Sequence, residues 1–180
     1  MTAALIIIDM QMEMQHRIDE GGGHVNGKAA EVITKLAKEF RARSIPVVHV
    51  RHQNMDPASP FHIDASGFPP MPCDYADDGE AVFVKTTSSA FMSTPLESHL
   101  REQGIERLYI TGAVAGFCVA SSIRSACDLG FQVTAVKDAI LGFDLPSAGL
   151  DAEEIFNVTM ALLESNFSKV ASANVVLKEL

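Results

Sequence analysis

The stretch that decides the fold is Ala3-Ala4-Leu5-Ile6-Ile7-Ile8-Asp9, an apolar run that a carboxylate ends. Its isoleucines and its shortness are typical of a strand that is buried on both faces. Such strands belong to parallel sheets that helices cover on both sides. The run is far shorter than the roughly 20 apolar residues that cross a bilayer. No cation precedes it, so we expect neither a membrane span nor a signal peptide here.

Outward from this run, short apolar segments alternate with helical patterns. Residues 26–43 carry apolar side chains at helical spacing, and Asn26 is expected to be the N-cap. Further strands are expected at 46–50, 80–84, 107–111, 132–136 and 168–170, and further helices at 95–103, 119–129 and 153–164, with Gly104 and Gly130 ending two of them. This alternation predicts an α/β fold, a three-layer doubly wound sheet of about six mainly parallel strands with helices on both faces.

Length and charge narrow the class of protein. A chain of 180 residues with 47% hydrophobic and 21% charged residues predicts a single globular domain over 1–180. Its formal net charge of −9 is a poor match to nucleic acid or to an anionic membrane surface, so we expect neither as a partner. Three cysteines without a Cys-x-x-Cys pair argue against a disulfide framework and for a reducing, cytoplasmic location.

One long irregular stretch, residues 51–79, carries five prolines. Loops of that length often form the lid or the wall of a site. A plain surface excursion is the alternative, and the sequence leaves both open.

Three reactive side chains fall at or just past the carboxyl ends of predicted strands, and these are Asp9, Lys85 and Cys118. Ligands of open α/β sheets bind beyond those ends. The topology therefore brings three residues that are far apart in sequence to one edge of the sheet. This convergence is the main prediction.

Each residue type suits a step of nucleophilic catalysis. A thiol at the start of a helix, such as Cys118, meets backbone N–H groups that stabilise thiolate and an oxyanion. Asp9 suits a general base and acid, and Lys85 is expected to lower the thiol pKa and to keep Asp9 ionised. Each residue also has an alternative role. For Cys118 it is that of a buried hydrophobic cysteine, which fits Cys127 better. For Asp9 it is a turn cap or a magnesium ligand beside Glu13, and for Lys85 an ordinary place on the surface.

Four segments in this order resemble the isochorismatase-like cysteine hydrolases, which include nicotinamidases and N-carbamoylsarcosine amidase. They are Leu5-Ile6-Ile7-Ile8-Asp9-Met10-Gln11; Val84-Lys85 with Ser89-Ala90-Phe91 and Thr94-Pro95-Leu96; Gly112-Ala113-Val114-Ala115-Gly116-Phe117-Cys118-Val119 with Arg124, Ala126 and Gly130; and Val136-Lys137-Asp138-Ala139. The match runs along nearly the whole chain.

The resemblance implies an Asp9–Lys85–Cys118 triad and a cis peptide between Ala113 and Val114. It further implies an oxyanion hole from the Val114 and Cys118 amides, six parallel strands, and a homo-oligomer, either dimer or tetramer. Nicotinamidases hold a metal through an Asp-x-His pair after the second strand. Residues 49–54 read His-Val-Arg-His-Gln-Asn instead. We therefore expect no metal and no cofactor.

The resulting hypothesis is a hydrolase that cleaves a C–N bond, amide or carbamoyl, of a small molecule through a thioester on Cys118. Met14, Phe91 and Phe117 are expected as pocket walls, with Arg51 or His52 orienting polar groups of the substrate. One alternative is an isochorismatase-type vinyl-ether hydrolase with Asp9 as the acid. Another is a binding module of the same fold without turnover.

Overall fold

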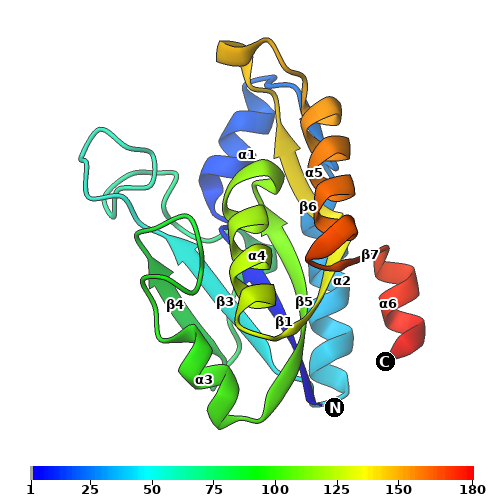
Figure 1. The fold of residues 1–180 in the computed structure, drawn as a ribbon. Helices are drawn as coiled ribbons and strands as arrows, with labels where there is room; N and C mark the ends of the chain where they lie inside the picture. Colours follow the sequence, from blue (N-terminus) through cyan, green and yellow to red (C-terminus); the bar gives the residue numbers. More distant parts are fainter. Residues whose placement is uncertain (1) are drawn as a thin grey trace.

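The computed structural model describes residues 2–180, and one seven-stranded sheet forms its middle layer (Figure 1). Six parallel strands lie in the order β4 (Ala81–Lys85), β3 (Val47–His52), β1 (Thr2–Ile8), β5 (Ile105–Ala113), β6 (Gln132–Phe143) and β7 (Lys169–Ala171). The short β2 (His24–Val25) pairs antiparallel with the far end of β6. The predicted fold class is confirmed.

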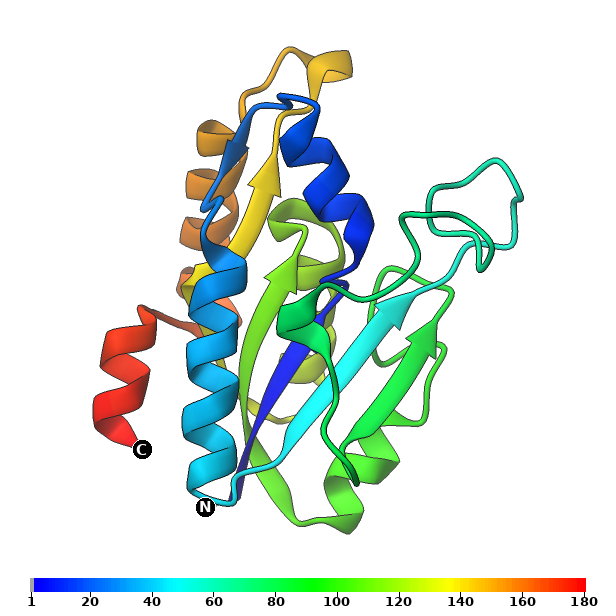
Figure 2. The same ribbon diagram turned by 180° about the vertical axis from the view of Figure 1, so that it is seen from behind.

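Helices cover both faces of the sheet. Figure 1 shows α3 (Leu96–Glu102), α4 (Ala120–Asp128) and α5 (Ala152–Asn166) in front of it. The view from behind shows α2 (Ala29–Ala42) and α6 (Ala173–Glu179) on the other face, with α1 (Met12–Asp19) beyond the carboxyl end of β1 (Figure 2). Each face buries its own apolar cluster. None of the helices in residues 2–180 combines the length and the apolar character needed to span a membrane.

The position of β1 explains its wholly apolar sequence. Ile6 and Ile8 point into the cluster under α3, α4 and α5, whereas Leu5 and Ile7 point into the cluster under α2. All four side chains are buried. Because alternate residues of a strand face opposite sides, a strand covered on both sides needs apolar residues at every position.

Three elements escape the sequence pattern. Helix α1 carries mostly polar residues and buries only Met14, so its helical periodicity is weak. The other two, β2 and α6, are short. Strand β6 runs to Phe143, although the sequence pattern predicts an end at residue 136. The pattern stops early because two charged residues interrupt the apolar run, at the place where the pairing with β5 shifts between Ala135 and Ile140.

The predicted N-cap role of Asn26 is wrong. Helix α2 begins at Ala29 after Lys28, without a side-chain cap. Asn26 has a φ of +59°, and its amide donates to the carbonyl oxygens of Lys137 and Ile140, both at 2.8 Å. Its polar side chain therefore secures the irregular part of β6. The predicted helix ends at Gly104 and Gly130 are confirmed, with φ values of +65° and +85°.

A buried ion network secures the end of the long segment between β3 and β4. His49 on β3 is fully buried, and its two ring nitrogens lie 2.6 Å from Asp74 Oδ1 and 2.9 Å from Glu80 Oε2. Arg41 of α2 also binds Glu80, and Arg51 binds Asp74. Burial alone lowers the pKa of His49, but the two carboxylates raise it above its ordinary value. The network ties α2, β3 and the segment before β4 together.

Glu80→Gln is expected to lower the free energy of unfolding by about 1–2 kcal/mol at pH 7, since it removes a charged acceptor from Arg41 and His49. Burial alone raises the pKa of Glu80, but hydrogen bonds from Arg41, Asp77 and His49 lower it to about 2. A depressed folded-state pKa stabilises the fold above the ordinary pKa of about 4.5, and this contribution is lost as pH falls through about 2.

Urea denaturation of both proteins across this pH range measures the effect. The difference between them should vanish toward the acid end. Glu31→Gln, which removes an exposed carboxylate from the same helix as Arg41, is the matched control. Equal stability of Glu80→Gln and the wild type at pH 7 would show that the network contributes nothing.

Candidate active site

The three predicted catalytic side chains meet at the carboxyl edge of the sheet. Asp9 directly follows β1, and Lys85 is the last residue of β4. Cys118 lies in a π-helical turn, Ala115–Val119, between β5 and α4. The neighbouring strands β1 and β5 are the point at which the sheet changes its direction of growth along the chain. Ligands of such sheets bind at this switch point.

The Lys85 ammonium lies between the carboxylate and the thiol. Its Nζ is 2.8 Å from Asp9 Oδ2 and 3.3 Å from Cys118 Sγ. It also lies 3.1 Å from the Thr87 carbonyl oxygen and 3.1 Å from His52 Nδ1. Lys85 is fully buried. A buried ammonium needs charged and polar partners, and this set supplies them.

The backbone around β1 and β5 is specialised for this site. Asp9 adopts a φ of +51°, a left-handed conformation that aspartate tolerates better than most residues. Gly112 near the end of β5 has a φ of +116°, and a Cβ there would lie 2.0 Å from the carbonyl oxygen of Ile8. Only glycine therefore lets β5 approach β1 this closely, one residue before Asp9.

Gln11 fastens the site to the long segment after β3. Its side chain is buried, accepts a hydrogen bond from the His52 amide at 2.8 Å, and donates to the His52 carbonyl at 3.0 Å. It also donates to the Phe68 carbonyl at 2.7 Å. These bonds fix the end of β3 and the inner end of the loop that projects beyond β3 and β4 in Figure 1.

Serines fasten the segment after Lys85 to α4. The Ser89 hydroxyl donates to Ser125 at 2.8 Å, and the Ala90 amide donates to Ser122 at 2.9 Å. Since α4 directly follows the turn that carries Cys118, these contacts fix the distance between the lysine segment and the thiol. Sequence reasoning missed this role, although serines three apart on one helix were the available signal.

Burial raises the pKa of Asp9 to about 6, and the charge and hydrogen bond of Lys85 offset part of that rise. The carboxyl group is therefore largely ionised at pH 7, only about one pH unit above its pKa. A pKa near the working pH suits a group that must both take and return a proton. Asp9 Oδ1 is buried and has no hydrogen-bond partner among the described residues, so it is free to receive one.

The thiol differs from its expected resting state. Burial and the negative charge of Asp9 raise the pKa of Cys118 to about 11, and the charge of Lys85 offsets only part of that rise. Lys85 lowers the thiol pKa as expected, but the net pKa in the resting enzyme lies above the ordinary value of a cysteine. Desolvation of the thiolate outweighs the charge of Lys85. Activation must come from proton transfer to a neighbouring base.

The amides predicted to form the oxyanion hole, those of Val114 and Cys118, lie just before and within the turn. The peptide bond between Ala113 and Val114 is cis. The Phe117 and Val119 amides both donate to the Val114 carbonyl, at 3.0 and 3.4 Å. Within residues 2–180, neither the Val114 amide nor the Cys118 amide donates to the backbone of another helix or strand.

The predicted pocket residues separate into two groups. Met14 and Phe91 lie in the hydrophobic core with 2% and 9% of their surface exposed, so neither offers an open surface to a substrate. Arg51 is held by Asp74. His52 contacts Lys85, and Phe117 beside the thiol is 53% exposed. These two remain available to a substrate.

Phe61 is an additional aromatic residue near the site. Its ring meets the His52 ring edge-on, with centroids 5.4 Å apart. It comes from the irregular segment, where no periodic pattern marks individual side chains.

Residues 2–180 contain no cluster of three or more His, Cys, Asp or Glu side chains suited to a metal ion.

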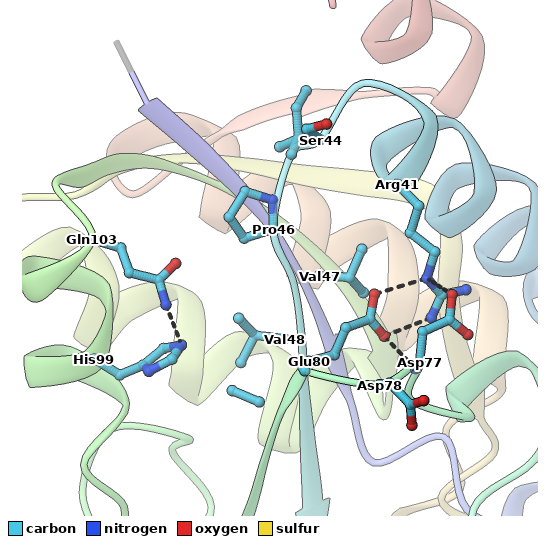
Figure 3. A pocket seen from close by; sticks show the side chains of 13 residues that line it. Arg41, Ser44, Pro46, Val47, Val48, Asp77, Asp78, Glu80, His99 and Gln103 are labelled. Carbon is cyan, nitrogen blue, oxygen red and sulfur yellow. Dashed lines mark hydrogen bonds and ion pairs between the residues drawn. The ribbon is translucent and has the colours of Figure 1, made fainter.

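The surface cavity in Figure 3, about 380 Å³, lies at the opposite edge of the sheet, before β3 and β4. Within it, Arg41 pairs with Asp77 and Glu80. On its other wall, Gln103 contacts His99 at 2.9 Å. It contains none of the triad residues and has no part in the candidate site.

Comparison with known proteins places this site in a family. The sequence profile of the isochorismatase domain matches residues 3–172. The chain belongs to the isochorismatase family. The isochorismatase family protein YrdC of Bacillus subtilis is 30% identical over 98% of this chain and 95% of its own. An isochorismatase-family crystal structure from Chromobacterium violaceum matches with a TM-score of 0.91 and 29% identity, covering 98% of this chain and 92% of that one.

A relative with a named reaction is more distant. The ureidoacrylate amidohydrolase RutB of Variovorax paradoxus is 34% identical over 80 residues, which cover 44% of this chain and 31% of that protein. Members of the isochorismatase family are hydrolases, and this chain is an enzyme of that class. The predicted resemblance is confirmed.

Proposed function

We propose that this family member hydrolyses a C–N bond, amide or carbamoyl, of a small molecule through a thioester on Cys118. One observation carries the proposal: a single buried ammonium bridges the Asp9 carboxylate and the Cys118 sulfur. This arrangement places a base beside a nucleophile, and a cation holds both. The name of the relative RutB supports the same class of bond.

In the first half-reaction, Asp9 takes the proton of the Cys118 thiol while the sulfur attacks the substrate carbonyl. The Val114 and Cys118 amides donate to the oxyanion that forms. As the C–N bond breaks, Asp9 returns the proton to the leaving nitrogen, and an amine or ammonia departs. The acyl group then remains on the sulfur as a thioester.

In the second half-reaction, Asp9 takes a proton from water, and the hydroxyl attacks the thioester carbonyl. The C–S bond breaks, the carboxylic or carbamic acid leaves, and the thiol regains the proton. Lys85 compensates negative charge on Asp9 and on the sulfur in turn. The pKa of Asp9, near 6, suits both directions of proton transfer.

The pKa of Asp9 also supports a second candidate, a vinyl-ether hydrolase in which Asp9 donates a proton to the substrate and Cys118 takes no part. A carboxyl group whose pKa lies near 6 keeps part of its protons close to neutral pH. The two candidates use the same residue in opposite protonation states.

The pH dependence of kcat/KM should separate them. If Asp9 is the base, kcat/KM falls about tenfold per pH unit below pH 6, because the carboxylate is lost as it takes up a proton. If Asp9 is the acid, kcat/KM falls as pH rises above 6. Initial rates at limiting substrate from about pH 4.5 to 8 decide between them. A profile that is flat across pH 6 contradicts both roles.

The substrate class is tested by screening ammonia release from small primary amides and ureido acids. The proposal expects turnover of at least one compound by the wild type and none by Asp9→Asn. A vinyl ether such as isochorismate belongs in the same screen. Turnover of the vinyl ether with no release of ammonia from any amide or ureido acid would favour the second candidate.

A further inference from the structure

The Lys85 ammonium has more acceptors around it than it has hydrogens. An ammonium carries three N–H groups. Four acceptors surround this one: Asp9 Oδ2 at 2.8 Å, the Thr87 carbonyl oxygen at 3.1 Å, His52 Nδ1 at 3.1 Å and Cys118 Sγ at 3.3 Å. At any moment one of the four therefore lacks a hydrogen of its own.

The competition falls between His52 and Cys118. Asp9 is charged and nearest, and the Thr87 carbonyl is fixed in the backbone two residues from Lys85. A neutral thiol is the weakest acceptor of the four, so in the resting enzyme the imidazole nitrogen competes for the third N–H and the sulfur holds it only part of the time. A thiolate is a charged acceptor, and it would have to draw that hydrogen away from His52.

His52 is an acceptor toward lysine and cannot be a donor, because the ammonium has no lone pair. Nδ1 must therefore be unprotonated, and the neutral ring carries its proton on Nε2. Burial, and then the charge of Lys85, lower the pKa of His52 to about 4. The ring consequently stays neutral, and remains an acceptor, across the pH range in which Asp9 titrates.

The imidazole is held in this position. The buried Gln11 side chain binds both the amide and the carbonyl of His52, at 2.8 and 3.0 Å. On its other side the ring contacts Phe61 edge-on. With its backbone clamped and its ring packed, His52 cannot readily give up its contact with Lys85.

We propose that His52 is a positioning residue that withholds one N–H of Lys85 from the Cys118 sulfur and so helps to keep the cysteine a neutral thiol between turnovers. Thiolates are the species that oxidants and alkylating agents attack. A sulfur kept protonated at rest is protected until Asp9 removes its proton. The proposal gains its catalytic meaning from the proposed function, but the state of the thiol can be measured without any substrate.

The test compares His52→Leu with His52→Asn. Leucine fills space without an acceptor, whereas the asparagine oxygen lies close to the place of Nδ1 and restores one. The measurement is the rate at which iodoacetamide alkylates Cys118 from about pH 7 to 10, followed on its peptide by mass spectrometry, with Cys73 and Cys127 as references in the same chain. Circular dichroism melting of both variants checks that they fold.

His52→Leu should alkylate Cys118 about three- to tenfold faster than the wild type at pH 7.5, because the thiolate gains a hydrogen bond without competition. His52→Asn should follow the wild-type profile. An unchanged or slower rate in His52→Leu would overturn the proposal, as would an equal change in both variants, which indicates a merely structural role.

A second measurement uses the wild type alone and stays informative if a variant fails to fold. In ¹⁵N-histidine-labelled protein, the His52 ring should show the Nε2–H tautomer and a titration midpoint of about 4. The Nδ1–H tautomer or an ordinary midpoint would overturn the proposal. A failed amide screen counts against the proposed function and leaves these two results standing.

Discussion

Cys118→Ala is expected to reduce amide turnover about 10⁴- to 10⁶-fold, because it removes the atom that forms the thioester. The fold should persist. The side chain is only partly buried, at the border of the cluster under α3, α4 and α5, so its loss opens no large cavity. Rates of ammonia release and the thermal midpoint, measured on the same preparation, separate the two effects.

Cys127→Ala provides the matched control. Cys127 lies on α4, the helix that follows the catalytic turn, and its sulfur lies 3.9 Å from the Asn166 carbonyl oxygen. Loss of this thiol should leave turnover unchanged. A Cys118→Ala enzyme that kept the full rate would refute covalent catalysis and favour acid catalysis by Asp9.

Lys85→Met is the second change with a large expected effect, about 10³-fold or more in kcat/KM at pH 7. Methionine keeps an unbranched side chain as far as Cε and removes the ammonium with its charge. Burial would then raise the pKa of Asp9 with no cation to offset it, and the midpoint would move above the present value of about 6. At pH 7 Asp9 would be protonated and no longer a base.

The pH profile distinguishes this cause from general damage. In Lys85→Met the acid limb of kcat/KM should move to higher pH, and part of the lost activity should return as pH rises. Lys137→Met, at an exposed lysine, is the control and should keep the wild-type profile. A uniform loss with an unshifted acid limb would mean that Lys85 does not set the charge of Asp9.

The residues at strand ends could be predicted because the fold determines their place. The apolar run before Asp9 predicts a buried parallel strand, and parallel strands bring their carboxyl ends to one edge. This geometry predicts that Asp9, Lys85 and Cys118 lie together, and in the structure the carboxylate and the sulfur both contact the Lys85 ammonium.

The state and the surroundings of these groups could not be predicted in the same way. The resting pKa of Cys118 depends on how much water the folded chain excludes, and no local pattern encodes that quantity. Met14 and Phe91, which stand close to Asp9 and Lys85 in the sequence, were expected as pocket walls, yet both are buried in the two apolar clusters. Nearness in sequence does not determine which face of an element a side chain occupies.

The long segment after β3 shows the same limit. Sequence predicts its length and its irregularity, but Gln11 and His49 secure its two ends through tertiary contacts. Arg51, expected to orient a substrate, instead binds Asp74 within that anchoring. The homo-oligomer, the cytoplasmic location, the small-molecule partner and the absence of a metal or cofactor stay predictions.

The central claim is that Cys118 carries the acyl group during turnover. It is tested most directly by acid-quenching the enzyme while it turns over an amide found in the screen and measuring its intact mass. The account predicts an added mass equal to the acyl part of the substrate, located on the Cys118 peptide and absent from Cys118→Ala. Rapid turnover with no adduct at any quench time, together with an active Cys118→Ala enzyme, would contradict it.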